Sequence, residues 1–308
     1  MMKIIFMGNS IIACPILNSL NNSKHDLIGV VSNSPKPAGR GRSLMYSPVG
    51  QLANELGLNF IPAKSLNDKV LIDTLRRLEA DIFVVVAFRI LPKIIFSLSK
   101  KGAINLHGSL LPKYRGAAPI QHSLLNGDKL TGVSTFLIDS NLDTGPIILQ
   151  KEIPIEDQDT FNSLSKKMSE EGIGIIFESL SLVHTVDFKP VPQVETEISH
   201  APKISNKMFE IDWSASATQI NNKVRALSYA GAFTFINGKR IKIFKSKVDL
   251  GINSKLPGEI SIVDKTRIIA GCGSQNLELL EIQIESKRRM TVEQWVNGNQ
   301  VNDGDLLG

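Results

Sequence analysis

The feature that most limits the possible folds of this chain is a continuously apolar run, Ile82-Phe83-Val84-Val85-Val86-Ala87. A strand with one face in water alternates apolar and polar residues, whereas a strand covered on both faces is apolar throughout. Around this run, β-rich segments alternate with helical patterns, which predicts βαβ units, a mostly parallel sheet and the α/β class. We expect strands at residues 3–7, 27–32, 81–87, 102–107, 130–137 and 146–153, and helices at 13–21, 48–56, 67–78, 92–98 and 160–184.

Residues 188–206 interrupt this alternation. The segment holds two nearby prolines, Pro190 and Pro192, and has no strong periodicity, which is typical of an extended linker. Beyond it, a helical pattern at residues 214–227 precedes short β-rich runs separated by glycine turns, which favours a small β-barrel. The sequence therefore predicts a first domain at residues 1–187, the linker, and a β domain at residues 207–308. We expect strands of the β domain at 232–236, 240–248, 258–263, 267–270 and 277–284.

Composition places the chain among ordinary globular proteins, with 308 residues of which 42% are hydrophobic and 21% charged. No apolar run approaches the roughly 20 residues of a membrane-spanning helix, and the start of the chain is too short for a signal peptide. Cys14 and Cys272 lie far apart without metal or redox spacing, and the histidines are scattered. We therefore expect a cytoplasmic protein, a monomer, with no bound metal and no membrane partner.

The distribution of charge says more than the net charge of +5. Residues 27–54 contain no acid but carry Lys36, Arg40 and Arg42, and residues 213–248 contain no acid but carry seven basic side chains. Two acid-free basic segments indicate a polyanionic partner. The alternative interpretation, a solvated basic face balanced by acids nearby in space, stays open for either segment.

Asn105 and His107 stand one residue apart at the end of the strand expected at residues 102–107. Because alternate side chains of a strand point to opposite faces, both should project to the same side. An amide donor beside an imidazole suits acyl transfer, since one group stabilises a developing oxyanion and the other handles a proton. A histidine with a purely structural role is the alternative for His107.

A second charged position, Asp143, precedes Gly145 and Pro146 in a predicted turn. A carboxylate close to His107 would orient the imidazole or a water molecule. Asp-Thr-Gly is also good turn chemistry, so a structural role for this aspartate stays open. The first turn of the chain has a single glycine, Gly8, and the absent glycine fingerprint argues against a dehydrogenase.

The segments NLHGSLLPKYRGAAPIQ at residues 105–121 and LDTGP at residues 142–146 resemble the formyltetrahydrofolate-dependent formyltransferases. The branch of that family that acts on methionyl initiator tRNA is similar along nearly the whole chain. The further similar segments are PAGRGR at 37–42, IDWS at 211–214, RAL at 225–227, GAFT at 231–234, LPG at 256–258 and KRRM at 287–290.

This resemblance implies a Rossmann-like catalytic domain followed by an OB-like β-barrel that binds tRNA. It implies transfer of a formyl group from 10-formyltetrahydrofolate, the co-substrate, to the α-amino group of methionine on initiator tRNA, for translation initiation. The implied catalytic residues are Asn105, His107 and Asp143. The implied folate-binding residues are Ser109, Leu110, Leu111, Pro112, Arg89, Ile90 and Leu91. The implied tRNA-binding residues are Lys36, Arg40, Arg42, Arg240 and Lys242.

The chain departs from the usual family pattern at residues 86–92, where VAFRILP replaces A-Y-G-x-I-L-P and resembles the glycinamide ribonucleotide formyltransferase version. Two rival functions keep the chemistry and change the acceptor: a nucleotide-sugar amine formyltransferase and a formyltetrahydrofolate hydrolase. The two basic segments argue against both. A noncatalytic RNA-binding protein is a third rival, and the intact Asn105, His107 and Asp143 argue against it.

Overall fold

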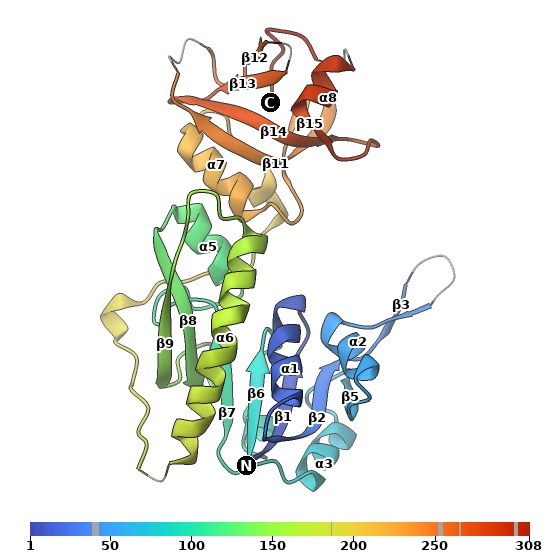
Figure 1. Ribbon diagram of the computed structural model, residues 1–308, viewed down its shortest axis with the longest axis vertical. Coiled ribbons are helices and arrows are strands. Elements are labelled where there is room, and N and C mark those ends of the chain that lie inside the picture. Colours follow the sequence, from blue (N-terminus) through green and yellow to red (C-terminus); the bar gives the residue numbers. More distant parts are fainter. Residues whose placement is uncertain (39–42, 186, 252–254, 265, 299–300) are drawn as a thin grey trace. The chain divides into compact units, whose positions relative to one another are not determined.

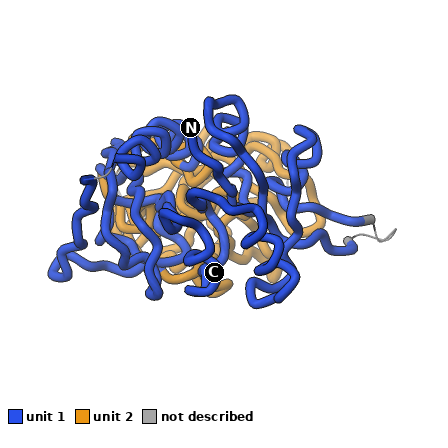
Figure 2. Tube along the Cα trace, turned by 90° about the horizontal axis from the view of Figure 1, so that it is seen from below, with its two compact units in different colours: residues 1–119, 130–154, 165–201 blue, residues 120–129, 155–164, 202–308 orange. Residues whose placement is uncertain are grey.

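A computed structural model describes residues 1–38, 43–185, 187–251, 255–264, 266–298 and 301–308 of the chain. The chain forms two compact units, which Figure 2 shows in different colours. The first unit consists of residues 1–119, 130–154 and 165–201, and the second of residues 120–129, 155–164 and 202–308. Each unit contains its own sheet and core, and each is described by itself.

The sheet of the first unit has seven strands in the order β5-β2-β1-β6-β7-β8-β9 (Figure 1). The first five strands of this order run parallel, whereas β8 and β9 are antiparallel to their neighbours. The predicted mostly parallel α/β sheet is therefore confirmed. The strands are β1 (Lys3–Gly8), β2 (Asp26–Asn33), β5 (Phe60–Ala63), β6 (Ile82–Val86), β7 (Ala103–His107), β8 (Leu130–Leu137) and β9 (Ile147–Pro154).

Helices connect these strands, at positions close to those expected from the apolar periodicity. The longest of them begins after Thr160, whose hydroxyl oxygen accepts a hydrogen bond from the Ser163 N–H at 3.3 Å and so caps the helix. Among the described residues, no helix is both long and apolar enough to cross a membrane. The helices are η1 (Ile11–Ala13), α1 (Cys14–Asn21), α2 (Pro48–Glu55), α3 (Lys69–Arg77), α4 (Lys93–Phe96), α5 (Pro119–Asn126), α6 (Phe161–His184) and η2 (Glu195–Glu197).

The strand β6 is buried at all five positions, as its apolar run predicts. It lies between β1 and β7 in the sheet, and helices cover both faces. On one face, alternate residues such as Met7 and Val85 share a core with Leu75 of α3 and Ile95 of α4. On the other face, α6 comes so close to β7 that a Cβ at Gly172 would lie 2.6 Å from Leu106.

Four elements of the first half have no counterpart in the sequence analysis: β5, α5, and the strands β3 (Lys36–Ala38) and β4 (Ser43–Met45), which pair as a hairpin. The strand β5 has only four residues and lies at the edge of the sheet. An alternation of apolar and polar residues over so few positions gives little signal. The two strands of the hairpin, with three residues each, are likewise too short to be recognised.

The strand order reverses between β1 and β6, because β2 and β5 extend the sheet on one side and β7 on the other. In open α/β sheets, ligands bind beyond the carboxyl ends of the strands at such a reversal. The ends of β1 and β6 are joined there by a hydrogen bond of 3.3 Å from the Asn9 N–H to the Ala87 carbonyl oxygen. Because β7 pairs with β6, its last residues lie beside this point.

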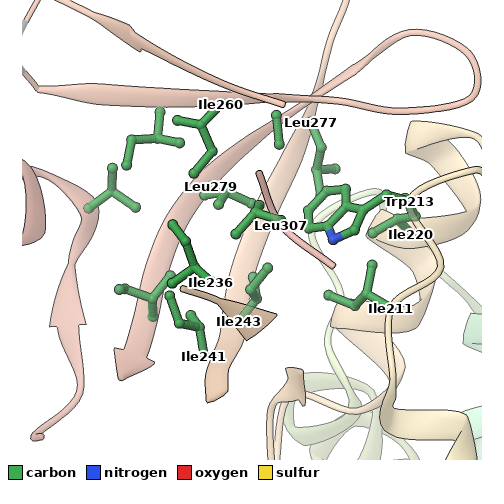
Figure 3. Packing of buried hydrophobic residues seen from close by; sticks show 14 of the residues in the cluster. Ile211, Trp213, Ile220, Ile236, Ile241, Ile243, Ile260, Leu277, Leu279 and Leu307 are labelled. Atoms are coloured by element: carbon green, nitrogen blue, oxygen red, sulfur yellow. The ribbon is translucent and has the colours of Figure 1, made fainter. Parts of the chain in front are cut away.

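The sheet of the second unit is antiparallel and follows the path β10-β11-β14-β13-β12, with β15 also paired to β14. The strands β10 to β14 all contribute side chains to one buried core, which includes Ile236, Ile260 and Trp213 (Figure 3). Because both end strands face the same core, the sheet curls around it, as a small β-barrel does. The elements are η3 (Asn206–Phe209), α7 (Ala217–Ala226), β10 (Ala232–Ile236), β11 (Lys239–Asp249), β12 (Ile260–Val263), β13 (Arg267–Gly271), β14 (Asn276–Ile284), β15 (Met290–Thr291) and α8 (Val292–Asn297).

The predicted linker at residues 188–206 divides between the two units after Ala201. In the first unit, Val191 and Ile147 exchange two backbone hydrogen bonds of 2.7 and 2.8 Å, so this part of the segment pairs with the start of β9. The second unit also includes residues 120–129 and 155–164. The functional division at residues 1–187 and 207–308 stays a prediction.

A buried carboxylate ties three strands of the second unit together. Glu278 of β14 is only 4% exposed and accepts hydrogen bonds from the Arg267 guanidinium at 3.0 and 2.8 Å. The Lys247 ammonium lies 3.0 Å from the same carboxylate. The hydrogen bonds from Arg267 hold the pKa of Glu278 below its ordinary value of 4.5, and Lys247 adds to this effect.

We expect Glu278→Gln to lower the free energy of unfolding of the second unit by about 1–3 kcal/mol, because Arg267 and Lys247 lose their charged partner. A folded-state pKa below the unfolded one stabilises the fold above pH 4.5, and this stabilisation is lost as the pH falls through the folded pKa. The wild type should lose stability more steeply than the variant in that range. Urea unfolding at pH 7 and pH 3.5 measures both effects, and tryptophan fluorescence reports on the second unit alone because both tryptophans, Trp213 and Trp295, lie in its core.

The exposed Glu293→Gln is the matched control, since it removes the same charge without a buried partner. Equal loss of stability in both variants would contradict the assigned role of Glu278.

Candidate active site

Asn105 and His107 lie at the carboxyl end of β7, between β6 and β8 in the sheet. In the strand register, Asn105 stands opposite Val85 and Phe136, and His107 stands opposite Ser134. The predicted strand therefore places both side chains on one face, next to the reversal of strand order. Asn105 is half-buried, and within the described part of the chain its side-chain amide makes no hydrogen bond. Its N–H groups remain available to a bound molecule.

His107 is 6% exposed, and its Nε2 lies 2.8 Å from the carbonyl oxygen of Tyr114. A carbonyl oxygen only accepts hydrogen bonds, so Nε2 carries a proton in this arrangement. Tyr114 stands in the loop that follows β7 and has a left-handed backbone, with φ of 60°. The loop therefore returns to the end of its own strand and fixes the plane of the imidazole ring.

Asp143 approaches the other ring nitrogen of His107 from a separate turn. Its Oδ2 lies 3.7 Å from His107 Nδ1, which is too long for a hydrogen bond but close enough for a charge interaction. The same oxygen accepts a hydrogen bond of 2.9 Å from the Gly116 N–H. The backbone of Asp143 is left-handed, with φ of 54°, and its side chain is buried. Two distant motifs of the sequence thus meet at one imidazole.

The predicted folate-binding segment Ser109–Pro112 forms the first part of the loop after β7. Ser134 of β8 holds it at two points, since its hydroxyl donates to the Ser109 carbonyl at 2.6 Å and accepts from the Leu111 N–H at 3.0 Å. The Gln150 amide donates to the Leu111 carbonyl at 2.8 Å. Ser109, Leu111 and Pro112 are buried, and Leu110 is half-buried. These contacts give the segment a fixed shape before any ligand binds.

The other predicted folate-binding segment, Arg89–Leu91, follows β6 at the reversal of strand order. The Arg89 guanidinium donates to the backbone carbonyls of Ala63 at 2.8 Å and Lys64 at 3.2 Å, so it points to the end of β5. Leu91 is buried in the core, whereas Ile90 is 69% exposed. The structure thus brings both predicted segments to the carboxyl edge of one sheet, after the neighbouring strands β6 and β7.

Two residues of the segment predicted as a linker hold parts of this site but have no signal in the sequence. Ser199 holds the loop after β7, and Gln193 holds the turn of Asp143. The Ser199 hydroxyl accepts from the Tyr114 N–H at 2.9 Å, and its carbonyl accepts from the Arg115 N–H at 2.9 Å. The Gln193 amide donates to the backbone carbonyl of Asp143 at 2.9 Å. Both act at long range on backbone groups, which no local motif reveals.

Among the predicted tRNA-binding residues of the first unit, Lys36 is exposed on β3, whereas Arg40 and Arg42 lie outside the described residues. The base of this hairpin is anchored by polar side chains. Asn9 Oδ1 accepts from the Ser32 hydroxyl and from the backbone N–H of the next residue, both at 2.9 Å. The Ser32 and Ser47 hydroxyls are 2.5 Å apart, which ties the two ends of residues 33–47 together.

The predicted tRNA-binding residues of the second unit, Arg240 and Lys242, lie on the outer face of β11. The alternation is the expected one, because Ile241 and Ile243 are fully buried in the core. The Arg240 guanidinium lies 5.0 Å from the ring centre of Phe233 on β10. Cations and an aromatic ring therefore share this outer face, a combination that suits contact with nucleic acid.

Cysteine chemistry and metal binding find little support in the described part of the chain. Burial raises the pKa of the Cys272 thiol to about 12 and also raises that of Cys14, so both are protonated at neutral pH. No three His, Cys, Asp or Glu side chains of the described residues gather as they do at a metal site.

Two family profiles match the chain. The profile described as Formyl transferase covers residues 2–180, and the one described as Formyl transferase, C-terminal domain, covers residues 203–300. A protein of Caldanaerobacter subterraneus subsp. tengcongensis named methionyl-tRNA formyltransferase is 37% identical over 99% of this chain and 100% of its own length. A protein of the same name from Thermodesulfovibrio yellowstonii is 40% identical over 98% of this chain and 97% of its own length.

Solved structures agree with this fold at lower identity. HypX from Aquifex aeolicus, in complex with tetrahydrofolic acid, matches with a TM-score of 0.69 and 16% identity over 98% of this chain and 48% of its own. An N-formyltransferase from Helicobacter canadensis, in complex with folinic acid and dTDP-3-aminofucose, matches with a TM-score of 0.66 and 21% identity over 91% of this chain and 99% of its own. With both family profiles matched and relatives similar over its full length, this chain belongs to the formyl transferase family.

Proposed function

We propose that this chain transfers the formyl group of 10-formyltetrahydrofolate to the α-amino group of methionine on initiator tRNA, for translation initiation in the cytoplasm. The observation that carries the proposal is the meeting of Asn105, His107 and Asp143 at the carboxyl end of β7, inside a formyl transferase fold. Relatives named methionyl-tRNA formyltransferase, 37–40% identical over nearly the whole chain, support the choice of acceptor.

The reaction exchanges one amide bond for another. The neutral amine of methionine attacks the formyl carbon, the bond between that carbon and N10 of the folate breaks, and one proton moves from the amine to N10. Charge gathers on the formyl oxygen during the attack, so a donor aimed at this oxygen lowers the barrier. The side-chain amide of Asn105, which has no hydrogen-bond partner among the described residues, is the donor we assign to this oxygen.

We assign the proton of the amine to the pair formed by His107 and Asp143. Nε2 of His107 already donates to Tyr114, so its Nδ1, 3.7 Å from Asp143, is the nitrogen left for proton exchange. The Asp143 carboxylate, which lies within charge-interaction distance of Nδ1, orients the ring for this exchange. Because the two substrates react directly, no covalent intermediate with the protein is needed.

The folate is proposed to lie along Ser109–Pro112 and Arg89–Leu91. Both segments end neighbouring strands at the reversal of strand order, which is the usual ligand position in such sheets. Their side chains are mostly apolar, and binding pockets are typically apolar with a few placed polar groups. The complexes of HypX with tetrahydrofolic acid and of the Helicobacter enzyme with folinic acid lend support by fold alone.

The tRNA is proposed to contact basic side chains of both units. On the second unit these are Arg240 and Lys242, on an outer face that also carries Phe233. On the first unit they are Lys36 and, outside the described residues, Arg40 and Arg42; the resemblance assigns selection of the initiator to this loop. We propose that the protein acts as a monomer.

A sugar amine is the second candidate acceptor, because one matched solved structure, WlaRD, is a sugar 3N-formyl transferase and the Helicobacter N-formyltransferase is in complex with dTDP-3-aminofucose. These proteins are 21–22% identical to this chain, whereas the relatives that act on methionyl-tRNA, by their names, reach 37–40%. The basic faces described above favour the polyanionic acceptor.

We expect Asn105→Ala to slow formyl transfer to charged initiator tRNA by roughly 10²–10³-fold, because one donor to the oxyanion is lost. Single-turnover transfer of labelled formyl measures the rate, with water as the only acceptor in a parallel reaction. The exposed Asn67→Ala is the matched control and should transfer at the wild-type rate. A near-wild-type rate for Asn105→Ala would remove its assigned role, and formate release independent of tRNA would favour a hydrolase.

We expect Arg240→Ala and Lys242→Ala to weaken binding of all tRNAs alike, since phosphate contacts do not read sequence. Each change should reduce the slope of log affinity against log salt by about one. Filter binding of initiator and elongator tRNA at several salt concentrations measures both quantities. The control is Lys69→Ala, an exposed lysine of the first unit. An unchanged salt slope in both variants would show that β11 is a solvated face instead.

A further inference from the structure

Gln193 links the turn that carries Asp143 to a buried arginine. Its side-chain Nε2 donates two hydrogen bonds, to the backbone carbonyls of Asp143 at 2.9 Å and Gly145 at 2.8 Å. Its Oε1 accepts two more, from Nε and Nη2 of Arg115 at 2.9 and 2.7 Å. A guanidinium only donates, so the amide oxygen must face Arg115 and the amide nitrogen must face the turn.

The turn needs such a support because its backbone is unusual. Asp143 has φ of 54°, a conformation that costs energy for any residue other than glycine. A Cβ at Gly145 would lie 1.7 Å from the carbonyl oxygen of Leu137, so the chain runs tightly against the end of β8. The two hydrogen bonds from Gln193 reach the carbonyls on both sides of Thr144 and hold the turn in this shape.

Arg115 is itself held in place. It is 8% exposed, and among the described residues no carboxylate lies within ion-pair distance of its guanidinium. Its backbone N–H donates to Ser199 at 2.9 Å, and its carbonyl accepts from Ala201 at 2.8 Å. A buried cation without a carboxylate is costly unless hydrogen bonds satisfy it. The two hydrogen bonds that the Arg115 guanidinium donates to Oε1 of Gln193 therefore fix the orientation of the Gln193 amide.

We propose that Gln193 is a positioning residue for the formyl transfer: it sets the place of the Asp143 carboxylate relative to His107 Nδ1. The inference rests on the proposed function. Gln193 does not touch the reacting atoms but acts through the backbone of Asp143. Since the carboxylate already stands 3.7 Å from the ring, a shift of the turn by one ångström would remove it from reach of a proton exchanged there.

Two variants separate this role from simple packing. Gln193→Leu removes all four hydrogen bonds. Gln193→Glu keeps the acceptor for Arg115 and replaces the donating Nε2 with one oxygen, which repels both carbonyls. We expect both variants to lower the single-turnover rate by about 10–100-fold, the usual cost of a small misplacement at a reacting site. The KM for tRNA should stay within about twofold, because the basic faces are untouched. Thermal unfolding of each variant shows whether the fold is retained.

A near-wild-type rate for Gln193→Glu would overturn the proposal, because support of Arg115 would then be the whole role of Gln193. The exposed Thr196→Ala, three residues along the same segment, is the matched control and should leave the rate unchanged.

A double-mutant cycle supplies the second test. In an Asp143→Ala background, Gln193→Leu should cause no further loss, because its effect passes through the missing carboxylate. An equal fold loss in both backgrounds would overturn the proposal. All rates are relative to the wild type, so failure of the proposed function can be told apart from failure of the Gln193 proposal. In the first case, the wild type itself would not formylate methionyl initiator tRNA.

Discussion

The pairing of β7 with the fully buried strand β6 is the constraint on which the rest of the first unit depends. It fixes the direction of β7, and the side-chain alternation of a strand then sends Asn105 and His107 to one face at its carboxyl end. Because the strand order reverses next to β6, the same pairing leaves a place for a ligand beside these two side chains. The two side chains to which we assign the chemistry thus stand on a rigid element, and a site on a strand is held more precisely than one on a loop.

The remaining parts of the site come to this rigid edge from loops, and polar side chains fix each loop. Ser134 and Gln150 shape the segment after β7, and Ser199 holds its later part. Gln193 holds the turn of Asp143. Loops have exposed backbone groups that need partners, and here the partners are side chains from strands and from the segment at residues 190–201. The shape of the candidate site therefore depends on residues outside the predicted catalytic and folate-binding sets.

The sequence predicted the parts of this arrangement that follow from local periodicity. The helix after Thr160 and the same-face pair at the end of β7 follow the period of their element, and the unbroken apolar run of β6 is typical of a strand covered on both faces, so all three could be recognised. The four-residue β5 is too short for such a signal. Gln193 could not be found because its partners, two backbone carbonyls and the Arg115 side chain, lie far away along the chain, and a hydrogen bond to a backbone carbonyl leaves no trace in the partner's residue type.

The roles proposed for the two units place different physical demands on them. Transfer of the formyl group needs atoms placed within fractions of an ångström, and the first unit supplies this with buried strands and hydrogen-bonded turns. Attraction of a polyanion needs only charge on a surface, and the outer face of β11 supplies that while its inner face fills a core. Outward charges on such a strand change without loss of packing, whereas the hydrogen-bonded turns of the first unit tolerate little change. In the proposed enzyme, the face that meets the acceptor can therefore vary independently of the site at the end of β7.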